Sequence, residues 1–411
     1  MRSRNAMLFT AVWIILGTAA LLYLGSILVG MLAAAPGSDA VERYFSEPFL
    51  ARAAAYQKAV LTVFLLQQVL YLVFLVAVAY TALCYFQAAP RLSLPAAAGY
   101  ILLFLIAAQL INLPFDFYRG SIIERRFGLS AQAVAGWFTD YGKSALISLL
   151  LSAVALTGLY VLITWRPAHW WFFAGTAFAL FLILGSYLYP LLIDPLFYRF
   201  TELEDRQLQE EIMKISSKAG LEVERILVAD ASRRTHKANA YFSGIGGTKR
   251  IVIYDNLLER FTPEEVLAVI AHEMGHWRYG HLWRGLLISA AGSFIAFYAL
   301  QLILQKVGLH ADFRALPLIL LFFALLSLAA VPAQNALSRC REQEADRYAF
   351  ALIGDPAPFV SLYQKLARTN LSVVQPHPLL KAALYTHPPL MERIEAAQQE
   401  AVERGEDGKR E

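Results

Sequence analysis

The chain has 411 residues, of which 58% are hydrophobic and only 17% are charged. Soluble domains contain about 25% charged residues, so this composition excludes an ordinary soluble protein and favours a membrane protein. The net charge is +4, and no run of Lys and Arg of the kind that binds nucleic acid occurs. This modest basic balance suits an anionic lipid surface. Of the two cysteines, Cys84 lies in an apolar block, so the pair Cys84 and Cys340 implies no disulfide framework.

Seven apolar segments reach the length of about 20 residues that a transmembrane helix needs. The first five follow one another closely, and a polar stretch separates them from the last two. The first segment begins after Met1-Arg-Ser-Arg-Asn5 and reaches about Ala34 without a small-residue cleavage pattern. It is therefore predicted to be an uncleaved span and not a signal peptide. The predicted spans are 7–34, 59–87, 96–115, 144–165, 169–189, 283–305 and 315–334.

These spans divide the chain into membrane and water-facing parts. Residues 1–189 hold the first five spans and residues 283–334 the last two. Between them, 190–282 is predicted to face water, 335–400 to complete that part, and the polar residues 401–411 to be disordered. An odd number of spans puts all three water-facing stretches on one side of the membrane. The short loops on that side hold slightly more Lys and Arg, which predicts that it is the cytoplasmic side.

The period of the apolar residues changes within the water-facing stretch. A helix near 203–219 is followed by strand patterns at 225–230, 239–243 and 250–254, with a glycine-rich turn at 244–249 before the last. The pattern predicts a small sheet. The fold class is therefore an all-α multi-pass membrane protein that carries a small α+β domain.

A helix with strong start signals follows the predicted sheet. Thr262 is placed as its N-cap, Pro263 as its first residue, and Glu265 as the partner of Thr262 in a capping box. Phe261 and Val266 have the spacing of a hydrophobic staple. The start of this helix is thus set by local sequence alone.

The same helix contains His272-Glu273-Met274-Gly275-His276, an H-E-x-x-H motif. Residues four apart lie on one face of a helix, so both imidazoles reach one Zn²⁺. Glu273 stands beside them as a candidate general base for hydrolysis. The alternative is a helix with two buried histidines and no metal. The firmly placed helix start makes the metal-binding geometry the better interpretation.

A third metal ligand is expected from elsewhere in the chain, because catalytic zinc sites use three protein ligands. Glu342 and Asp346 follow the last span and lie four apart, so Glu342 is predicted to bind the metal and Asp346 to accept from a ligand imidazole. Glu344 points elsewhere on that helix. A solvated charged helix beyond the membrane is the alternative. His281 is a second candidate ligand, but the spacing lacks the glycine-containing extension of such proteases, so a histidine at the membrane interface is favoured.

The H-E-M-G-H motif together with Ser338-Arg339-Cys-Arg-Glu342-Gln-Glu-Ala-Asp346 resembles the type I CAAX prenyl endopeptidases, which are membrane-embedded zinc metalloproteases. Further segments match this family in the same order along the chain. These segments are 122–128, 195–201, 239–244 and 385–393. The joint match covers most of the chain, and its order is more specific than any single segment except the histidine pair.

The resemblance implies one zinc ion per chain, held by His272, His276 and Glu342, with Glu273 activating water. It places Asp346 and Arg339 around these ligands. It also implies seven long helices that enclose a large water-filled chamber, with the metal at its cytoplasmic-side rim.

On the substrate side, the resemblance implies an edge strand that aligns a peptide by backbone pairing. Asn239, Ala240 and Tyr241 belong to that strand. His387 is implied to donate to the oxyanion of the tetrahedral intermediate. Without the family, Asn239 is a residue at a strand end and His387 a helix-start residue before two prolines.

The activity predicted is that of a zinc metalloendopeptidase (EC 3.4.24 class) acting on a peptide or protein substrate. The tail carries no endoplasmic-reticulum retrieval signal, and the chain is rich in Ala with short loops, which suggests a bacterial homologue in the inner membrane. Whether the substrate is prenylated or only membrane-associated therefore stays open. Other candidate functions are a membrane-protein quality-control protease and a non-catalytic scaffold or translocation-clearing factor. A transporter ranks lower, because Asn112, Asp116 and Asp194 lie only near span ends.

Overall fold

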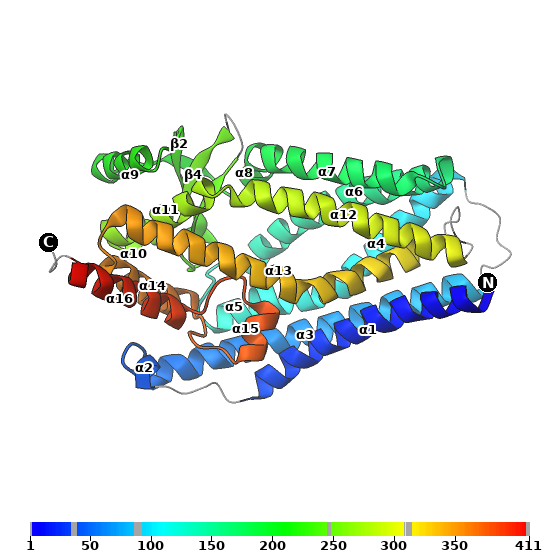
Figure 1. Ribbon diagram of the computed structural model, residues 1–411, viewed down its shortest axis with the longest axis horizontal. Coiled ribbons are helices and arrows are strands. Elements are labelled where there is room, and N and C mark those ends of the chain that lie inside the picture. Colours follow the sequence, from blue (N-terminus) through cyan, green and yellow to red (C-terminus); the bar gives the residue numbers. More distant parts are fainter. Residues whose placement is uncertain are drawn as a thin grey trace.

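The computed structural model describes residues 2–33, 39–85, 93–244, 248–307, 309 and 315–407. Within this part, seven helices are long and apolar enough to cross a membrane, which confirms the predicted number of spans. Figure 1 shows these helices running lengthwise, with the sheet and the shorter helices gathered at the end opposite the N-terminus. The spans are Ala11–Leu32, Glu47–Ala82, Leu94–Arg126, Val134–Trp165, Trp170–Phe197, His281–Lys306 and Ala315–Ile353.

Most of the helices extend beyond the apolar segments, because helix continues into polar sequence that hydropathy does not mark. Two spans contain a π-helical turn near their C-terminal end, a local feature that apolar patterning does not report. The large chamber between the helices stays a prediction. The elements of the spans are α1 (Arg2–Leu32), α3 (Glu47–Tyr85), α4 (Leu94–Phe117), η1 (Tyr118–Ile123), α5 (Glu124–Arg126), α6 (Val134–Trp165), α7 (Trp170–Leu188), η2 (Tyr189–Ile193), α8 (Asp194–Phe197), α12 (His281–Val307) and α13 (Ala315–Ile353).

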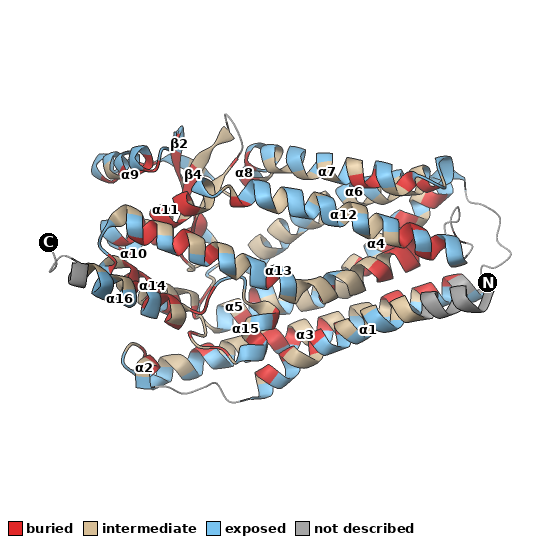
Figure 2. Cartoon of the chain, viewed as in Figure 1, coloured by how far each residue is buried: buried red, intermediate tan, exposed pale blue. Residues whose placement is uncertain are grey.

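Apolar side chains cover the outside of the long helices. Leu21 on α1, Val154 on α6 and Ile295 on α12 are each more than 70% exposed. Figure 2 shows exposed and intermediate residues along most of these helices and a concentration of buried residues around α11 (Pro263–Arg278). A surface this apolar is stable only when lipid covers it, so the composition and the structure agree on a membrane protein.

The water-facing part contains a four-stranded sheet. Its order is β1 (Phe200–Glu202), β2 (Arg225–Ala229), β4 (Arg250–Tyr254) and β3 (Ala240–Ser243), with β2 and β4 parallel and both outer strands antiparallel to their neighbours. The three predicted strands are confirmed. β1 was not predicted, because three residues are too short to show an alternating pattern. β3 lies at the edge of the sheet, as the substrate-strand prediction requires.

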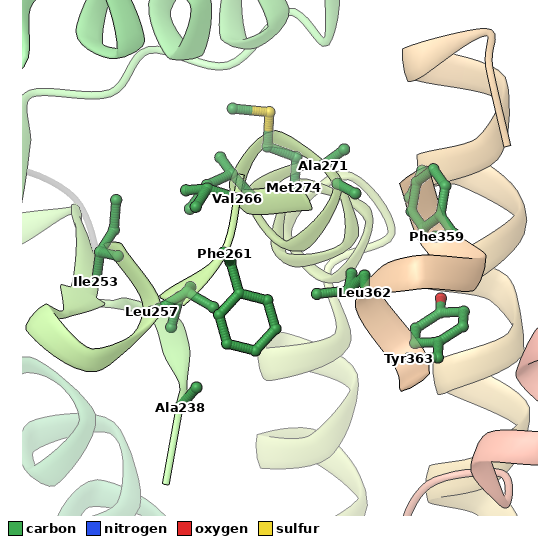
Figure 3. Packing of buried hydrophobic residues seen from close by; sticks show 14 of the residues in the cluster. Ala238, Ile253, Leu257, Phe261, Val266, Ala271, Met274, Phe359, Leu362 and Tyr363 are labelled. Atoms are coloured by element: carbon green, nitrogen blue, oxygen red, sulfur yellow. The ribbon is translucent and has the colours of Figure 1, made fainter. Parts of the chain in front are cut away.

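Helix α11 lies at the centre of the largest buried cluster. Figure 3 shows side chains from β4, α10 and α14 gathered around it, among them Ile253, Leu257, Phe359 and Leu362. Burial on several sides holds α11 against both the sheet and the C-terminal helices. The remaining elements are α2 (Asp39–Glu42), α9 (Arg206–Lys218), η3 (Ala231–Arg233), α10 (Asp255–Arg260), α14 (Ala357–Asn370), α15 (Pro378–Leu384) and α16 (Leu390–Asp407).

The prediction of a disordered tail is wrong for part of 401–411. Helix α16 continues to Asp407, and residues 408–411 lie outside the described part. The helix has an apolar face, with Met391, Ile394 and Ala397 buried in the cluster around α11. Residues 401–403 are exposed, and Arg404 donates to Glu400 and to the Gly354 carbonyl at 2.8 and 3.1 Å, contacts that support helix in a charged sequence which composition alone marks as disordered.

Candidate active site

The start of α11 has the predicted capping box. The Thr262 hydroxyl accepts from the Glu265 backbone N–H at 3.4 Å, and the Glu265 carboxylate accepts from the Thr262 backbone N–H at 2.9 Å. Lys365 on α14 adds a contact of 2.7 Å to the same carboxylate. The helix that carries His272 and His276 is therefore fixed at its first turn.

Glycine at position 275 lets α11 approach α13 closely. A Cβ atom built there lies 2.8 Å from the Cα atom and 2.9 Å from the carbonyl oxygen of Ala345, closer than real side chains approach. Ala345 is fully buried and sits between Glu342 and Asp346 on α13. The close contact brings both carboxylates to the histidine pair.

The structure brings together the three predicted ligands, His272, His276 and Glu342. The two Nε2 atoms lie 3.1 Å apart, and the Glu342 carboxylate oxygens lie 3.2 Å from His272 Nε2 and 3.3 Å from His276 Nε2. Ligand atoms about 2.0–2.2 Å from a tetrahedral zinc are separated by about 3.3 Å. The spacing of the donor atoms thus fits one zinc ion.

The charge at these atoms also fits a cation. Oε2 of Glu342 is buried and makes no hydrogen bond of good geometry, although two imidazole nitrogens lie near it. Burial lowers the pKa of His272, but Asp346 and Glu342 outweigh this effect and raise that pKa to about 9. The negative charge that favours a proton on His272 equally favours a metal ion between the three side chains.

Asp346 contacts a ligand imidazole, as predicted. Its Oδ1 lies 2.7 Å from His272 Nδ1. Arg393 donates to both carboxylate oxygens at 2.6 and 2.8 Å, and the Tyr363 hydroxyl donates at 3.1 Å. Arg393 and Tyr363 were not predicted to contribute. Arg393 ends the matched segment 385–393 and would have been a candidate on that ground, but Tyr363 has no such signal.

His281 is not among the three clustered donor residues, and it begins the sixth span, as the interface prediction expects. It is buried, with Nδ1 2.9 Å from His276 Nδ1 and Nε2 3.0 Å from Glu344 Oε2. Glu344 does point away from Glu342, as predicted, and it meets His281 there. The spacing of His276 and His281 suggested a shared role, but the sequence does not show which atoms meet.

Glu273 lines a cavity of about 340 Å³ together with His272 and His387. Burial raises the pKa of its carboxyl group, while His272, His276 and the backbone N–H of Phe242 oppose that shift. A carboxylate with a raised pKa is a stronger proton acceptor, which suits the predicted role of general base.

His387 reaches the site from the C-terminal segment. Its Nε2 lies 3.2 Å from Glu342 Oε2, and Thr386 Oγ1 lies 2.9 Å from its Nδ1. Arg339, which was predicted to lie around the metal ligands, contacts the backbone of the C-terminal segment instead. It donates to the carbonyl oxygens of Lys381 and Tyr385 at 3.0 and 2.7 Å, and so holds the segment that carries His387.

The edge strand β3 borders the same cavity. Asn239 and Ala240 line it, whereas the Tyr241 hydroxyl donates to Asp194 at 3.1 Å on the side of α8. The structure therefore brings two of the three predicted strand residues to the cavity and places the Tyr241 side chain elsewhere. Asn370 bonds to the backbone of Ala238 through both amide atoms, at 3.0 and 3.4 Å, and caps the edge just before Asn239.

Two family models match consecutive parts of the chain. Residues 31–199 match the model described as CAAX prenyl protease N-terminal, five membrane helices, and residues 202–401 match peptidase family M48. A protein of Bacillus subtilis named uncharacterized metalloprotease YhfN is 33% identical over 74% of this chain and 73% of its own length. The chain belongs to peptidase family M48, with the membrane helices of the CAAX prenyl proteases.

Eukaryotic relatives and a solved structure agree with that assignment. A CAAX prenyl protease 1 homolog of Arabidopsis thaliana is 32% identical over 70% of each chain. The crystal structure of S. mikatae Ste24p superimposes with a TM-score of 0.77 and 23% identity, covering 96% of this chain and 98% of that one. The fold of this M48 family member is therefore that of Ste24p, and the protein is an integral-membrane metallopeptidase.

Proposed function

We propose that this M48 peptidase is a zinc endopeptidase that hydrolyses peptide bonds at the site on α11 and α13. The observation that carries the proposal is the set of three donor atoms, separated by 3.1 to 3.3 Å, beside the Glu273 carboxylate. His272, His276 and Glu342 would hold one zinc ion per chain. A bound zinc ion would supply Lewis acidity toward water and the scissile carbonyl.

Three side chains of the protein carry out the remaining steps of the proposed hydrolysis. Glu273 takes the proton from the attacking water and later delivers it to the leaving amine. His387 lies near the ligand carboxylate and donates a hydrogen bond to the oxyanion. Asp346 holds His272 so that its Nε2 lone pair points toward the other two donor atoms.

The substrate strand is proposed to pair with the edge of β3. In an antiparallel ladder every second residue directs its N–H and C=O away from the neighbouring strand. Tyr254 N–H donates to the Asn239 carbonyl at 3.0 Å, so the backbone groups of Ala240 point to the open edge beside the cavity. Asn370 occupies the backbone groups of Ala238, so Ala240 is the next cavity-lining position of this edge at which a substrate strand can pair.

We propose that the substrate is a membrane-associated peptide, and the cleavage assay below tests whether it must be prenylated. The Arabidopsis relative is named a CAAX prenyl protease, a name that points to prenylated substrates. The name of the Bacillus relative gives no substrate. The side of the membrane is proposed to be the cytoplasmic one, on the Lys and Arg content of the short loops.

The test is a cleavage assay with purified protein and zinc on a prenylated peptide and its unprenylated counterpart. We expect Glu273→Gln to abolish cleavage and to keep one zinc per chain by metal analysis. Glu342→Ala should lose zinc. Cleavage retained by Glu273→Gln refutes the proposed base, and unchanged zinc in Glu342→Ala assigns the third ligand elsewhere. Equal rates on the two peptides would remove prenylation from the substrate definition.

A further inference from the structure

A sharp corner between α11 and α12 returns the chain to the metal site. Gly280 in this corner has φ +63°, the left-handed region that glycine adopts without strain. His281 follows as the first residue of α12 and is 6% exposed. The Tyr279 ring stacks on its imidazole, with ring centroids 5.9 Å apart and an interplanar angle of 21°. The position and plane of His281 are thus fixed by its surroundings.

The contacts of His281 decide where the protons lie. A carboxylate only accepts, so the 3.0 Å contact to Glu344 Oε2 puts the hydrogen of the neutral His281 ring on Nε2. Nδ1 of His281 is then an acceptor. The 2.9 Å contact between the two Nδ1 atoms therefore takes its hydrogen from His276.

This arrangement leaves the lone pair of His276 on Nε2, the atom that faces Glu342 at 3.3 Å. His272 has the same tautomer, because its Nδ1 lies 2.7 Å from the Asp346 carboxylate and donates its hydrogen there. Both ligand imidazoles thus present Nε2 to the same point. For His272 the acceptor is a buried carboxylate, and for His276 it is an imidazole oriented by a carboxylate.

The outer end of this chain of contacts meets solvent. The Glu344 side chain is 45% exposed and also receives Arg284 at 3.4 Å. Arg284 therefore helps to hold the Glu344 carboxylate against His281. Because Glu344 is partly exposed, its contribution is smaller than that of His281.

We propose that His281 and Glu344 are positioning residues that fix the tautomer and orientation of the metal ligand His276. This inference rests on the proposed metal site. It goes beyond that site by assigning a role to His281 and Glu344, which lie outside the ligand set. Removing an outer partner of a ligand histidine typically weakens metal binding by about 10–100-fold.

The experiment measures zinc affinity, with full-length protein in detergent that has been stripped of metal by a chelator. Zinc is titrated in competition with a chromophoric chelator, and the visible spectrum of the Co²⁺ form is recorded for each variant. His281→Leu removes the acceptor while keeping an apolar side chain of similar bulk. His281→Asn restores an acceptor near the Nδ1 position. His169→Leu, at an exposed position before α7 at the opposite end of the membrane helices, is the matched control.

We expect His281→Leu to bind zinc about 10–100-fold more weakly with a shifted Co²⁺ spectrum. We expect His281→Asn to recover most of the affinity and His169→Leu to match the wild type. Glu344→Leu should lose several-fold, and it tests the same idea at a tolerant position if His281→Leu does not fold. Affinity and spectrum unchanged in His281→Leu, or in Glu344→Leu in that case, would overturn the proposal.

Two further outcomes of the zinc titration are distinguishable from those above. A loss beyond about 1,000-fold in His281→Leu, with no recovery in His281→Asn, would make His281 itself a ligand and overturn the positioning role. A wild-type protein that binds no zinc would overturn the proposed function, whatever the variants do.

Discussion

The contact between Asp346 and Arg393 offers a test that separates stability from metal binding. Asp346 is 4% exposed and Arg393 9% exposed, with contacts of 2.6 and 2.8 Å between them. Burial opposes the charge of Arg393, but Asp346 more than compensates and raises the pKa of its guanidinium. A guanidinium is not deprotonated in proteins, so it stays charged in a variant that removes Asp346.

Asp346→Asn leaves this charge buried without its counterion. Removing one partner of a buried pair costs about 3–5 kcal/mol. For a folding unit of 150–250 residues, each kcal/mol lowers the melting temperature by about 2–4 °C, so the expected loss is about 6–20 °C. The same change replaces the carboxylate acceptor of His272 Nδ1 by a weaker, neutral amide oxygen, so zinc affinity should fall by about 10-fold, the lower end of the range for such partners. Thermal unfolding in detergent and zinc competition measure the two effects.

A double variant, Asp346→Leu with Arg393→Leu, separates the effect on stability from the effect on zinc affinity. Replacing both members of a buried pair by apolar residues is often neutral for stability, so melting should recover toward the wild type. Zinc affinity should stay low, because leucine at position 346 offers no acceptor to His272 Nδ1. If zinc affinity recovers together with melting, Asp346 acts on the metal site only through folding, and the reasoning is refuted.

Asp140 provides a matched control away from the metal. It forms a similar two-contact pair with Arg234, at 2.7 and 3.1 Å, with side-chain exposures of 20% and 16%. Asp140→Asn should lower the melting temperature by less than Asp346→Asn, since water reaches this pair. Its zinc affinity should equal that of the wild type, and a loss there would show that any buried-pair defect disturbs the site.

Two glycine substitutions test helix packing. Gly275→Ala places a Cβ 2.8 Å from the α13 backbone, so we expect a loss of about 1–3 kcal/mol and weaker zinc binding as Glu342 moves away; unchanged zinc affinity would show that the close approach is not needed. In the membrane, Gly175→Val should lower thermal stability in detergent because a Cβ there meets the Phe294 ring of α12 at 2.5 Å. Gly185→Val, in open space on the same helix, should have little effect, and equal losses would contradict the packing argument.

Part of the site follows from local sequence. The start of α11 was predictable because Thr262, Pro263 and Glu265 interact within one helical turn, and the spacing of His272 and His276 then fixes their common face. The seven spans were predictable for the same kind of reason, since lipid requires about 20 apolar residues in succession. Glu342 needed one further assumption, namely that the last span continues as a helix.

The rest depends on contacts that sequence spacing does not encode. The strand β1 is too short to carry a pattern, and the end of α16 stays helical where Arg404 contacts Glu400 and the Gly354 carbonyl. Arg339 was predicted to lie around the metal ligands, but it donates to carbonyl groups of the His387 segment. Tyr241 was placed at the substrate, but its hydroxyl serves the junction with α8.

By itself, then, the sequence determined the membrane spans and the capped helix, because each depends on neighbours within a few turns. It also predicted the three side chains that we propose to bind the metal. Only the tertiary structure decided what surrounds them. Asp346 meets Arg393 from 47 residues away, and His281 meets Glu344 from 63 residues away. These partners are set by how closely α11 packs on α13 and by the corner at Gly280. Such packing is a property of the folded chain, and it orients both ligand histidines.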